Sequence, residues 1–286
     1  MKSITSGLNL ESDIQSGDYR INYEISSSDR SQPLIILTHG YMAHKDGPNQ
    51  KGLREMLQGN GFGTLSFNLP GHGNEIDHTQ EGFHNFAFQN LRISHCVDIL
   101  EDVISHARSE HSFDKIGLAG SSTGALFNMV AASRDPSIYA MALYSAATDV
   151  AALAEKKVGY AALFGLFLKK FHPNKTKRAY IINNGEREWP YHFGFYWDAR
   201  KFRGSDLPQI DVPTMFLHGE DDQIVPIEQP RSMVDIMPAS HLVSFPEGDH
   251  GFTNEQDREK AAEHIAEFFK DPKNYLKQLA TESNGE

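Results

Sequence analysis

Lys115-Ile-Gly-Leu-Ala-Gly-Ser-Ser-Thr-Gly124 joins a buried-strand pattern to a helical pattern through a turn bounded by two glycines. The turn has the form G-x-S-x-G, in which the central serine occupies a strained strand-to-helix crossing and the glycines leave room for it. Only Ser122 has a glycine two positions away on both sides. The pattern therefore indicates Ser122 as a nucleophile, with Ser121 as the second candidate. By itself, the same pattern also fits a Gly/Ser-rich turn without a chemical role.

Strand and helix patterns alternate along the rest of the chain. Residues 19–25 alternate apolar and polar side chains, which is typical of a half-buried antiparallel strand. Helices with one apolar face are expected at 90–108, 123–133 and 255–270. Continuous apolar runs, typical of central parallel strands, lie at 33–38, 63–69, 115–119, 139–144, 213–217 and 242–245. This alternation predicts an α/β fold with a mostly parallel sheet that helices cover on both faces.

The alternation stops between Ala147 and Asp206. Aromatic residues make up 12 of the 58 residues in 148–205, against 10% of the whole chain, and both tryptophans lie there. Because a structureless connection of this length is uncommon in a compact domain, we predict an inserted cap (lid) subdomain at 148–205. Residues 1–147 and 206–286 would form the core. The apolar run 158–168 fits either a lid helix or a packed segment, and the polar chain from Lys270 onward is expected to fray.

Composition restricts the class of protein. A chain of 286 residues with 39% hydrophobic and 23% charged residues is typical of a globular protein and excludes a low-complexity one. The net charge of −11, without a segregated basic face, disfavours nucleic-acid binding. Cys96 is the single cysteine, so no intrachain disulfide can form. The start of the chain lacks a signal-peptide pattern and no apolar run is long enough to span a bilayer, so we expect a cytoplasmic protein.

Downstream segments supply the partners that a serine nucleophile needs. A serine hydroxyl is a weak nucleophile near neutral pH, so a base must take its proton and a carboxylate must orient that base. His218-Gly-Glu-Asp-Asp222 follows one predicted strand, and Gly248-Asp-His250-Gly-Phe252 follows the next. Since each segment follows a parallel strand, the candidates meet at the carboxyl edge of the sheet. The chain order is serine, aspartate, histidine.

These motifs, in this order, resemble the serine α/β-hydrolase superfamily over residues 19–270. The resemblance gives the acid role to Asp222 and the base role to His250. Asp221, next to the assigned acid, and Asp149, after the preceding strand, stay as the second and third candidates for the acid.

The resemblance also implies an oxyanion hole, the pair of donors that stabilises the negative oxygen of a tetrahedral intermediate. The donors would be the backbone N–H groups of Tyr41, in the turn His39-Gly40-Tyr41, and of Thr123. His39 is expected to be a structural hydrogen-bonding residue. His72, in the turn 68–73, is expected at the surface.

Within the superfamily, the short cap and the H-G-Y turn look most like the cinnamoyl or feruloyl esterases and related small carboxylesterases. The resemblance implies a carboxylesterase-type serine hydrolase that cleaves esters of small acyl or aryl groups through an acyl-enzyme. Trp189 and Trp197 are candidate substrate-binding residues, although a small cap also needs aromatic rings for its own core. The alternatives are a serine peptidase or thioesterase of the same fold and a catalytically feeble ligand-binding module.

Other chemistries lack their motifs. The histidines do not have H-E-x-x-H spacing, there is no cysteine pair, and no G-x-G-x-x-G follows the first strand. We therefore expect no metal and no cofactor. The expected partner is a small-molecule ester, without nucleic acid or a membrane span, and a homodimer is left open.

Overall fold

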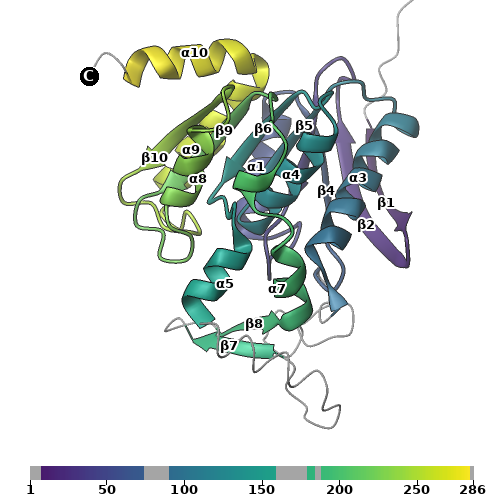
Figure 1. Ribbon diagram of the computed structural model, residues 1–286. Coiled ribbons are helices and arrows are strands. Elements are labelled where there is room, and N and C mark those ends of the chain that lie inside the picture. Colours follow the sequence, from purple (N-terminus) through teal and green to yellow (C-terminus); the bar gives the residue numbers. More distant parts are fainter. Residues whose placement is uncertain (1–7, 74–89, 159–178, 184–187, 284–286) are drawn as a thin grey trace, which may run out of the picture.

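The computed structural model describes residues 8–73, 90–158, 179–183 and 188–283. Its centre is an eight-stranded sheet in the order β1-β2-β4-β3-β5-β6-β9-β10 (Figure 1). Pairing is antiparallel from β1 through β2 to β4 and parallel between all other neighbours. The strands are β1 (Leu8–Ser16), β2 (Tyr19–Ser27), β3 (Leu34–Thr38), β4 (Gly63–Phe67), β5 (Ile116–Ser121), β6 (Ala140–Tyr144), β9 (Thr214–Gly219) and β10 (Ser240–Phe245). The predicted α/β fold with a mostly parallel sheet is confirmed.

Helices cover both faces of the sheet, and β3 shows why its sequence is continuously apolar. Ile36 packs in one core with α3 (Ile93–Ser109) and α4 (Thr123–Arg134). Ile35 and Leu37 point the other way, into a second core with α1 (Pro48–Gly59) and α9 (Glu255–Lys270). Successive strand residues face opposite sides, so a strand buried on both sides needs an apolar residue at every position.

Outside the connection between β6 and β9, four described elements were not expected from the sequence: β1, α1, α8 (Glu228–Val234) and α10 (Pro272–Ser283). The expectation that the chain frays after Lys270 is wrong for α10. Its side chains Tyr275, Leu276 and Leu279 pack against the core on the α9 side. A hydrogen bond of 2.6 Å also joins the Tyr275 hydroxyl to Nδ1 of His264 in α9. This amphipathic packing orders a segment that looked merely polar.

The long connection between β6 and β9 contains α5 (Val150–Val158), the antiparallel pair β7 (Ala179–Asn183) and β8 (Glu188–His192), α7 (Phe193–Ala199) and the short helix η2 (Gly204–Asp206). Figure 1 shows α5, α7 and the β7–β8 pair together beyond one end of the sheet. The limits of the predicted cap stay a prediction, because residues 159–178 and 184–187, with most of the apolar run 158–168, lie outside the described residues. The remaining helix, α8 (Glu228–Val234), follows β9.

The parallel strands place their carboxyl ends at one edge of the sheet. The segments that leave β3, β5, β6, β9 and β10 there carry every residue that the sequence singled out for chemistry. Within the described ranges, no helix is both long enough and apolar enough to cross a bilayer.

Candidate active site

Ser122 lies at the sharp turn between β5 and α4. Its backbone has φ 51° and ψ −120°, a conformation that residues with a side chain rarely adopt. The Ser122 N–H donates to the Tyr144 carbonyl at 3.0 Å, and the Ser122 carbonyl accepts from the Ala147 N–H at 3.1 Å. A Cβ at Gly124 would lie 2.4 Å from the Thr38 carbonyl oxygen, so only glycine allows α4 to start this close to β3. The close packing of α4 against the end of β3 thus explains why a glycine lies two residues after Ser122.

His250 links Ser122 to Asp222. Its Nε2 lies 3.2 Å from the Ser122 Oγ, and its Nδ1 lies 2.7 Å from the Asp222 Oδ2. An Nδ1–H that donates to the carboxylate leaves Nε2 free to accept the serine proton. The structure therefore brings together the three residues that the sequence placed in the order serine, aspartate, histidine.

Asp222 is held as a buried carboxylate. Its side chain is buried, and its Oδ1 accepts from the N–H groups of Ile224 and Val225, both at 2.8 Å. Burial raises the pKa of the Asp222 carboxyl, but hydrogen bonds from His218 and His250 outweigh it and hold the pKa well below its ordinary value. Asp222 therefore keeps its negative charge beside the histidine at neutral pH.

His218 is a second histidine on the same carboxylate, and no role was expected for it from the sequence. The ring is fully buried, with Nε2 2.9 Å from the Val225 carbonyl and 3.3 Å from the Asp222 Oδ2. An Nε2–H of His218 therefore points at both acceptors. It links the two ends of the loop 218–225, which carries Asp222. The sequence feature that could have indicated this contact is the spacing of four residues between His218 and Asp222.

The alternative candidates for the nucleophile and for the acid do not hydrogen-bond to His250 within the described residues. The Ser121 Oγ accepts from the Gln50 Nε2 at 3.3 Å, on the α1 side. Asp221 is an exposed turn residue. Asp149 accepts from the Ala152 N–H at 2.8 Å in the first turn of α5 and pairs with Arg203 at 2.7 Å. Among the hydrogen bonds of the described residues, none joins these three side chains to His250.

The turn after β3 lies directly against the nucleophile. A Cβ at Gly40 would lie 2.9 Å from the Ser122 Cβ, so glycine is required for this approach. Tyr41 follows in the chain. On the other side of Ser122, Thr123 is the first residue of α4, where a backbone N–H has no acceptor within the helix. Gly40, which precedes Tyr41, and Thr123 thus both adjoin Ser122, and the oxyanion role of the Tyr41 and Thr123 N–H groups stays a prediction.

Two buried histidines support this turn. As predicted, His39 is a structural residue: its Nδ1 hydrogen-bonds the Gly40 carbonyl at 2.8 Å, and its Nε2 accepts from the Leu69 N–H at 3.0 Å. The expectation of a surface His72 is wrong, because its side chain is buried and its Nε2 accepts from the Met42 N–H at 3.2 Å. Met42 has φ 60°, so this hydrogen bond holds an unfavourable backbone conformation next to Tyr41.

We expect His39 and His72 to make the protein less stable at acid pH. Burial lowers the pKa of His39 to about 4, although its hydrogen bond to Gly40 opposes the shift, and burial together with His39 lowers the pKa of His72. Each ring is thus neutral in the fold but protonates near pH 6.5 when unfolded. The contribution of the neutral rings to the free energy of unfolding is fully present above about pH 6.5 and is lost as pH falls toward 4. For His39 this loss amounts to ~3 kcal/mol. Urea unfolding between pH 7.5 and 4.5 would show the loss, and an NMR titration of His39 with a midpoint near 6.5 would contradict it.

Ser145 was not singled out from the sequence, and it supports the loop that carries His250. It directly follows β6, is 1% exposed and has φ 48°. Its Oγ donates to the His250 carbonyl at 2.8 Å, while its N–H donates to the Leu217 carbonyl at 2.9 Å. Ser145 therefore ties the histidine loop to the edge of the sheet between β6 and β9.

Ser145→Ala is expected to lower kcat by about 5- to 10-fold with little change in KM, because the loss of one hydrogen bond of about 1 kcal/mol loosens the position of His250. Steady-state kinetics would measure both constants. Ser145→Gly is the matched control, since it removes the same hydroxyl but relieves the positive φ. Full activity in Ser145→Gly would mean that strain, and not the hydroxyl, explains the alanine result.

The two tryptophans differ in what the structure describes. Trp189 lies in β8, opposite Ile182 of β7, and its side chain is outside the described residues. Trp197, in α7, is 53% exposed and stacks with the Arg200 guanidinium at 5.1 Å. The aromatic contact with the site comes instead from Phe195, whose ring centre lies 4.8 Å from that of Tyr41. The enrichment of aromatic residues pointed to this segment without identifying Phe195.

A serine elbow after β5, an acid after β9 and a histidine after β10 on a mostly parallel sheet define the α/β-hydrolase class. The Alpha/beta hydrolase family profile matches residues 35–264, and the chain belongs to this family.

Solved structures with the same fold are distant in sequence. Est1E from Butyrivibrio proteoclasticus, in a structure with bound ferulic acid, is 20% identical with a TM-score of 0.73, over 94% of this chain and 99% of that one. Mouse alpha/beta hydrolase domain-containing protein 10 is 17% identical with a TM-score of 0.69, over 91% and 98%. Esterase Pf2001 from Pyrococcus furiosus is 16% identical with a TM-score of 0.62, over 92% of both chains.

One curated relative matches over a short segment. The non-heme chloroperoxidase CPO-A1 of Kitasatospora aureofaciens is 37% identical over 65 residues, which are 22% of this chain and 24% of that protein. The chain thus matches about a quarter of the length of this relative.

Proposed function

We propose that the protein is a serine hydrolase that cleaves carboxylic esters of small acyl or aryl groups. The observation that carries this proposal is the hydrogen-bonded series in which His250 lies 3.2 Å from the Ser122 Oγ and 2.7 Å from the Asp222 Oδ2. A buried carboxylate, an oriented imidazole and a hydroxyl at a strained turn are the parts that nucleophilic acyl transfer requires.

The reaction proceeds in two halves. In the first, the Ser122 Oγ attacks the ester carbonyl carbon while His250 Nε2 takes the hydroxyl proton. The carbon–oxygen bond to the alcohol then breaks, His250 returns the proton to the departing alcohol, and an acyl-enzyme remains. In the second half, water attacks the acyl carbon, its proton passes to His250 and then to Ser122, and the carboxylic acid leaves.

Backbone donors stabilise the charge that develops on the carbonyl oxygen. The N–H groups of Tyr41 and Thr123 are proposed for this role, because the turn at Gly40 packs on Ser122 and Thr123 begins α4. The amino end of a helix carries partial positive charge, which favours an oxyanion there. The loss of one such donor typically costs about 10²-fold or more in rate.

Aromatic rings next to the site favour a small acyl or aryl group. Phe195 of α7 packs on Tyr41, so an apolar surface lies directly beside the proposed oxyanion donors. The ferulic acid bound to Est1E is an aryl acid of this size class, which supports a similar preference here.

A substrate panel tests the proposal and its alternatives. The panel contains p-nitrophenyl acetate, p-nitrophenyl butyrate, methyl ferulate, an acyl thioester and a chromogenic peptide amide. We expect turnover of the oxygen esters at rates at least about 10²-fold above those of the amide. Faster cleavage of the amide or the thioester would favour a peptidase or thioesterase, and no turnover of any substrate would favour a ligand-binding module.

Trp197→Ala tests whether the cap contributes to the substrate site. If the exposed ring contacts the acyl group, KM for methyl ferulate should rise about 5- to 150-fold, the effect of about 1–3 kcal/mol of lost apolar contact. KM for p-nitrophenyl acetate, which is too small to reach the ring, should stay within about 2-fold of the wild-type value. Unchanged kinetics with both esters in Trp197→Ala and in Trp189→Ala would mean that the two rings belong to the structure of the cap and do not contact the substrate.

A further inference from the structure

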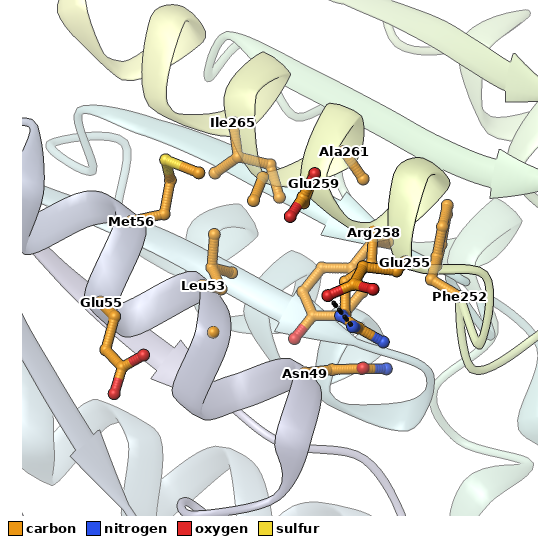
Figure 2. A pocket seen from close by; sticks show the side chains of 13 residues that line it. Asn49, Leu53, Glu55, Met56, Phe252, Glu255, Arg258, Glu259, Ala261 and Ile265 are labelled. Atoms are coloured by element: carbon orange, nitrogen blue, oxygen red, sulfur yellow. Dashed lines mark ion pairs between the residues drawn. The ribbon is translucent and has the colours of Figure 1, made fainter.

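A cavity lies on the opposite face of the sheet from α3 and α4, between α1 and α9. Its volume is about 390 Å³, within the range of small-molecule sites. Figure 2 shows apolar side chains of the two helices facing each other across it. The apolar part of the wall consists of Leu53, Met56, Phe252, Ala261, Ala262 and Ile265.

The wall also contains a buried polar group that lacks a partner. Tyr144 lines the cavity and is 6% exposed, and its hydroxyl forms no hydrogen bond of normal geometry with any described residue. Burial raises the pKa of this phenol, and the nearby Ser121 hydroxyl offsets the shift only in part. A buried hydroxyl without a partner is costly, and a polar ligand group in the cavity would relieve that cost.

Charge at the mouth of the cavity is mostly negative. Glu55, Glu255 and Glu259 are exposed there, and Arg258 is the one cation among the lining residues. Arg258 forms an ion pair with Glu255 at 4.0 Å, drawn dashed in Figure 2. Glu55 pairs with Lys51 of α1 at 3.9 Å, so Glu259 is the carboxylate at the mouth for which the described residues show no ion pair. In a chain with a net charge of −11, such a mouth favours cations over anions.

We propose that this cavity is a binding site for a small amphipathic cation, an amine whose apolar body carries a hydroxyl group at its far end. The apolar body would lie between α1 and α9, and the ammonium group would lie at the acidic mouth. Tyr144 would supply a hydrogen bond inside the cavity. The site is separate from the proposed ester site, so it does not depend on the proposed reaction.

The cavity adjoins the loop that carries His250. Phe252 of that loop forms part of its wall, and Asn49 at the start of α1 donates through Nδ2 to the Gly251 carbonyl. A ligand in the cavity would therefore contact the segment that positions His250 against Ser122.

Gly52 offers a direct way to fill the cavity. It lies in α1 and lines the cavity, and a Cβ there would meet no atom within 4 Å. Gly59 in the same helix is also free of contacts within 4 Å, but it does not line the cavity. Gly52→Phe and Gly59→Phe are thus matched variants, because both add the same ring to α1 and only the first occupies the cavity.

The probe is tyramine (4-hydroxyphenethylamine), whose ammonium group suits the acidic mouth and whose phenol hydroxyl can hydrogen-bond Tyr144; it is titrated by calorimetry into the full chain at pH 7.5. We expect saturable binding with a Kd of about 1 mM or below, at least ~10-fold weaker binding to Gly52→Phe, and binding to Gly59→Phe within about 2-fold of wild type. Circular dichroism would verify that both variants fold. No saturable binding to the wild-type chain, or equal binding to Gly52→Phe, would overturn the site.

Two further titrations test the chemistry of the ligand. 3-(4-Hydroxyphenyl)propionate, which replaces the ammonium group of tyramine with a carboxylate, should bind at least ~10-fold more weakly than the amine. Glu259→Gln should weaken amine binding by about 3-fold, as expected for one exposed carboxylate. Binding of the carboxylate as tight as that of the amine would overturn the assignment of a cation.

Discussion

Ser122→Ala is expected to reduce ester turnover by at least about 10⁴-fold, because no acyl-enzyme can form without the Oγ nucleophile. The fold should persist, since the backbone hydrogen bonds of Ser122 to Tyr144 and Ala147 do not involve the hydroxyl. Steady-state kinetics with p-nitrophenyl acetate would measure the loss, and thermal unfolding would show whether stability is retained.

Ser121→Ala is the matched control for this prediction. It removes the neighbouring hydroxyl, which accepts from Gln50 on the α1 side and not from His250. Its turnover should stay within about 3-fold of wild type, because an isolated hydrogen bond of this kind contributes about 1 kcal/mol or less. An active Ser122→Ala together with an inactive Ser121→Ala would show that the nucleophile was assigned to the wrong serine.

Asp222→Asn is expected to lower kcat by about 10⁴-fold. The N–H groups of Ile224 and Val225 both donate to Oδ1, so they should hold the amide oxygen of the asparagine at that position. Its NH₂ group would then face the His250 Nδ1, which would have to accept instead of donate. The ring proton would move to Nε2, and His250 could no longer take the serine proton.

The neighbouring carboxylates serve as controls for Asp222. Asp221→Asn should have little effect on kcat, because Asp221 is an exposed turn residue. Asp149→Asn should lower stability through its contacts with Arg203 and α5, while kcat falls by less than about 10-fold. A loss of about 10⁴-fold in either control, with Asp222→Asn active, would move the acid role to that residue.

The local patterns of the sequence predicted the sheet and the main residues of the site. Each candidate follows an apolar run that the structure confirms as a parallel strand, so the topology alone brings Ser122, Asp222 and His250 to one edge. The glycine spacing around Ser122 carried the same information, because the close approach of α4 to β3 excludes a side chain at Gly124.

The supporting residues depend on tertiary contacts that sequence patterns do not encode. His72 reaches Met42 across 30 positions, and Ser145 reaches His250 across 105, so neither contact follows from local spacing. A surface turn was the simplest interpretation of His72, but packing against His39 buries it. In α10 the signal was present as Tyr275, Leu276 and Leu279, but the polar composition of the segment concealed it.

Covalent labelling of the intact protein with a fluorophosphonate, followed by mass spectrometry of the labelled peptide, tests directly whether Ser122 is the activated nucleophile. An activated serine displaces fluoride and retains the phosphonyl group, so we expect one phosphonyl group per chain, located on Ser122. His250→Ala should abolish the labelling, since the base that activates the hydroxyl is then missing. An unlabelled wild-type protein, or a label on any other residue, would contradict the assignment of Ser122 as the nucleophile.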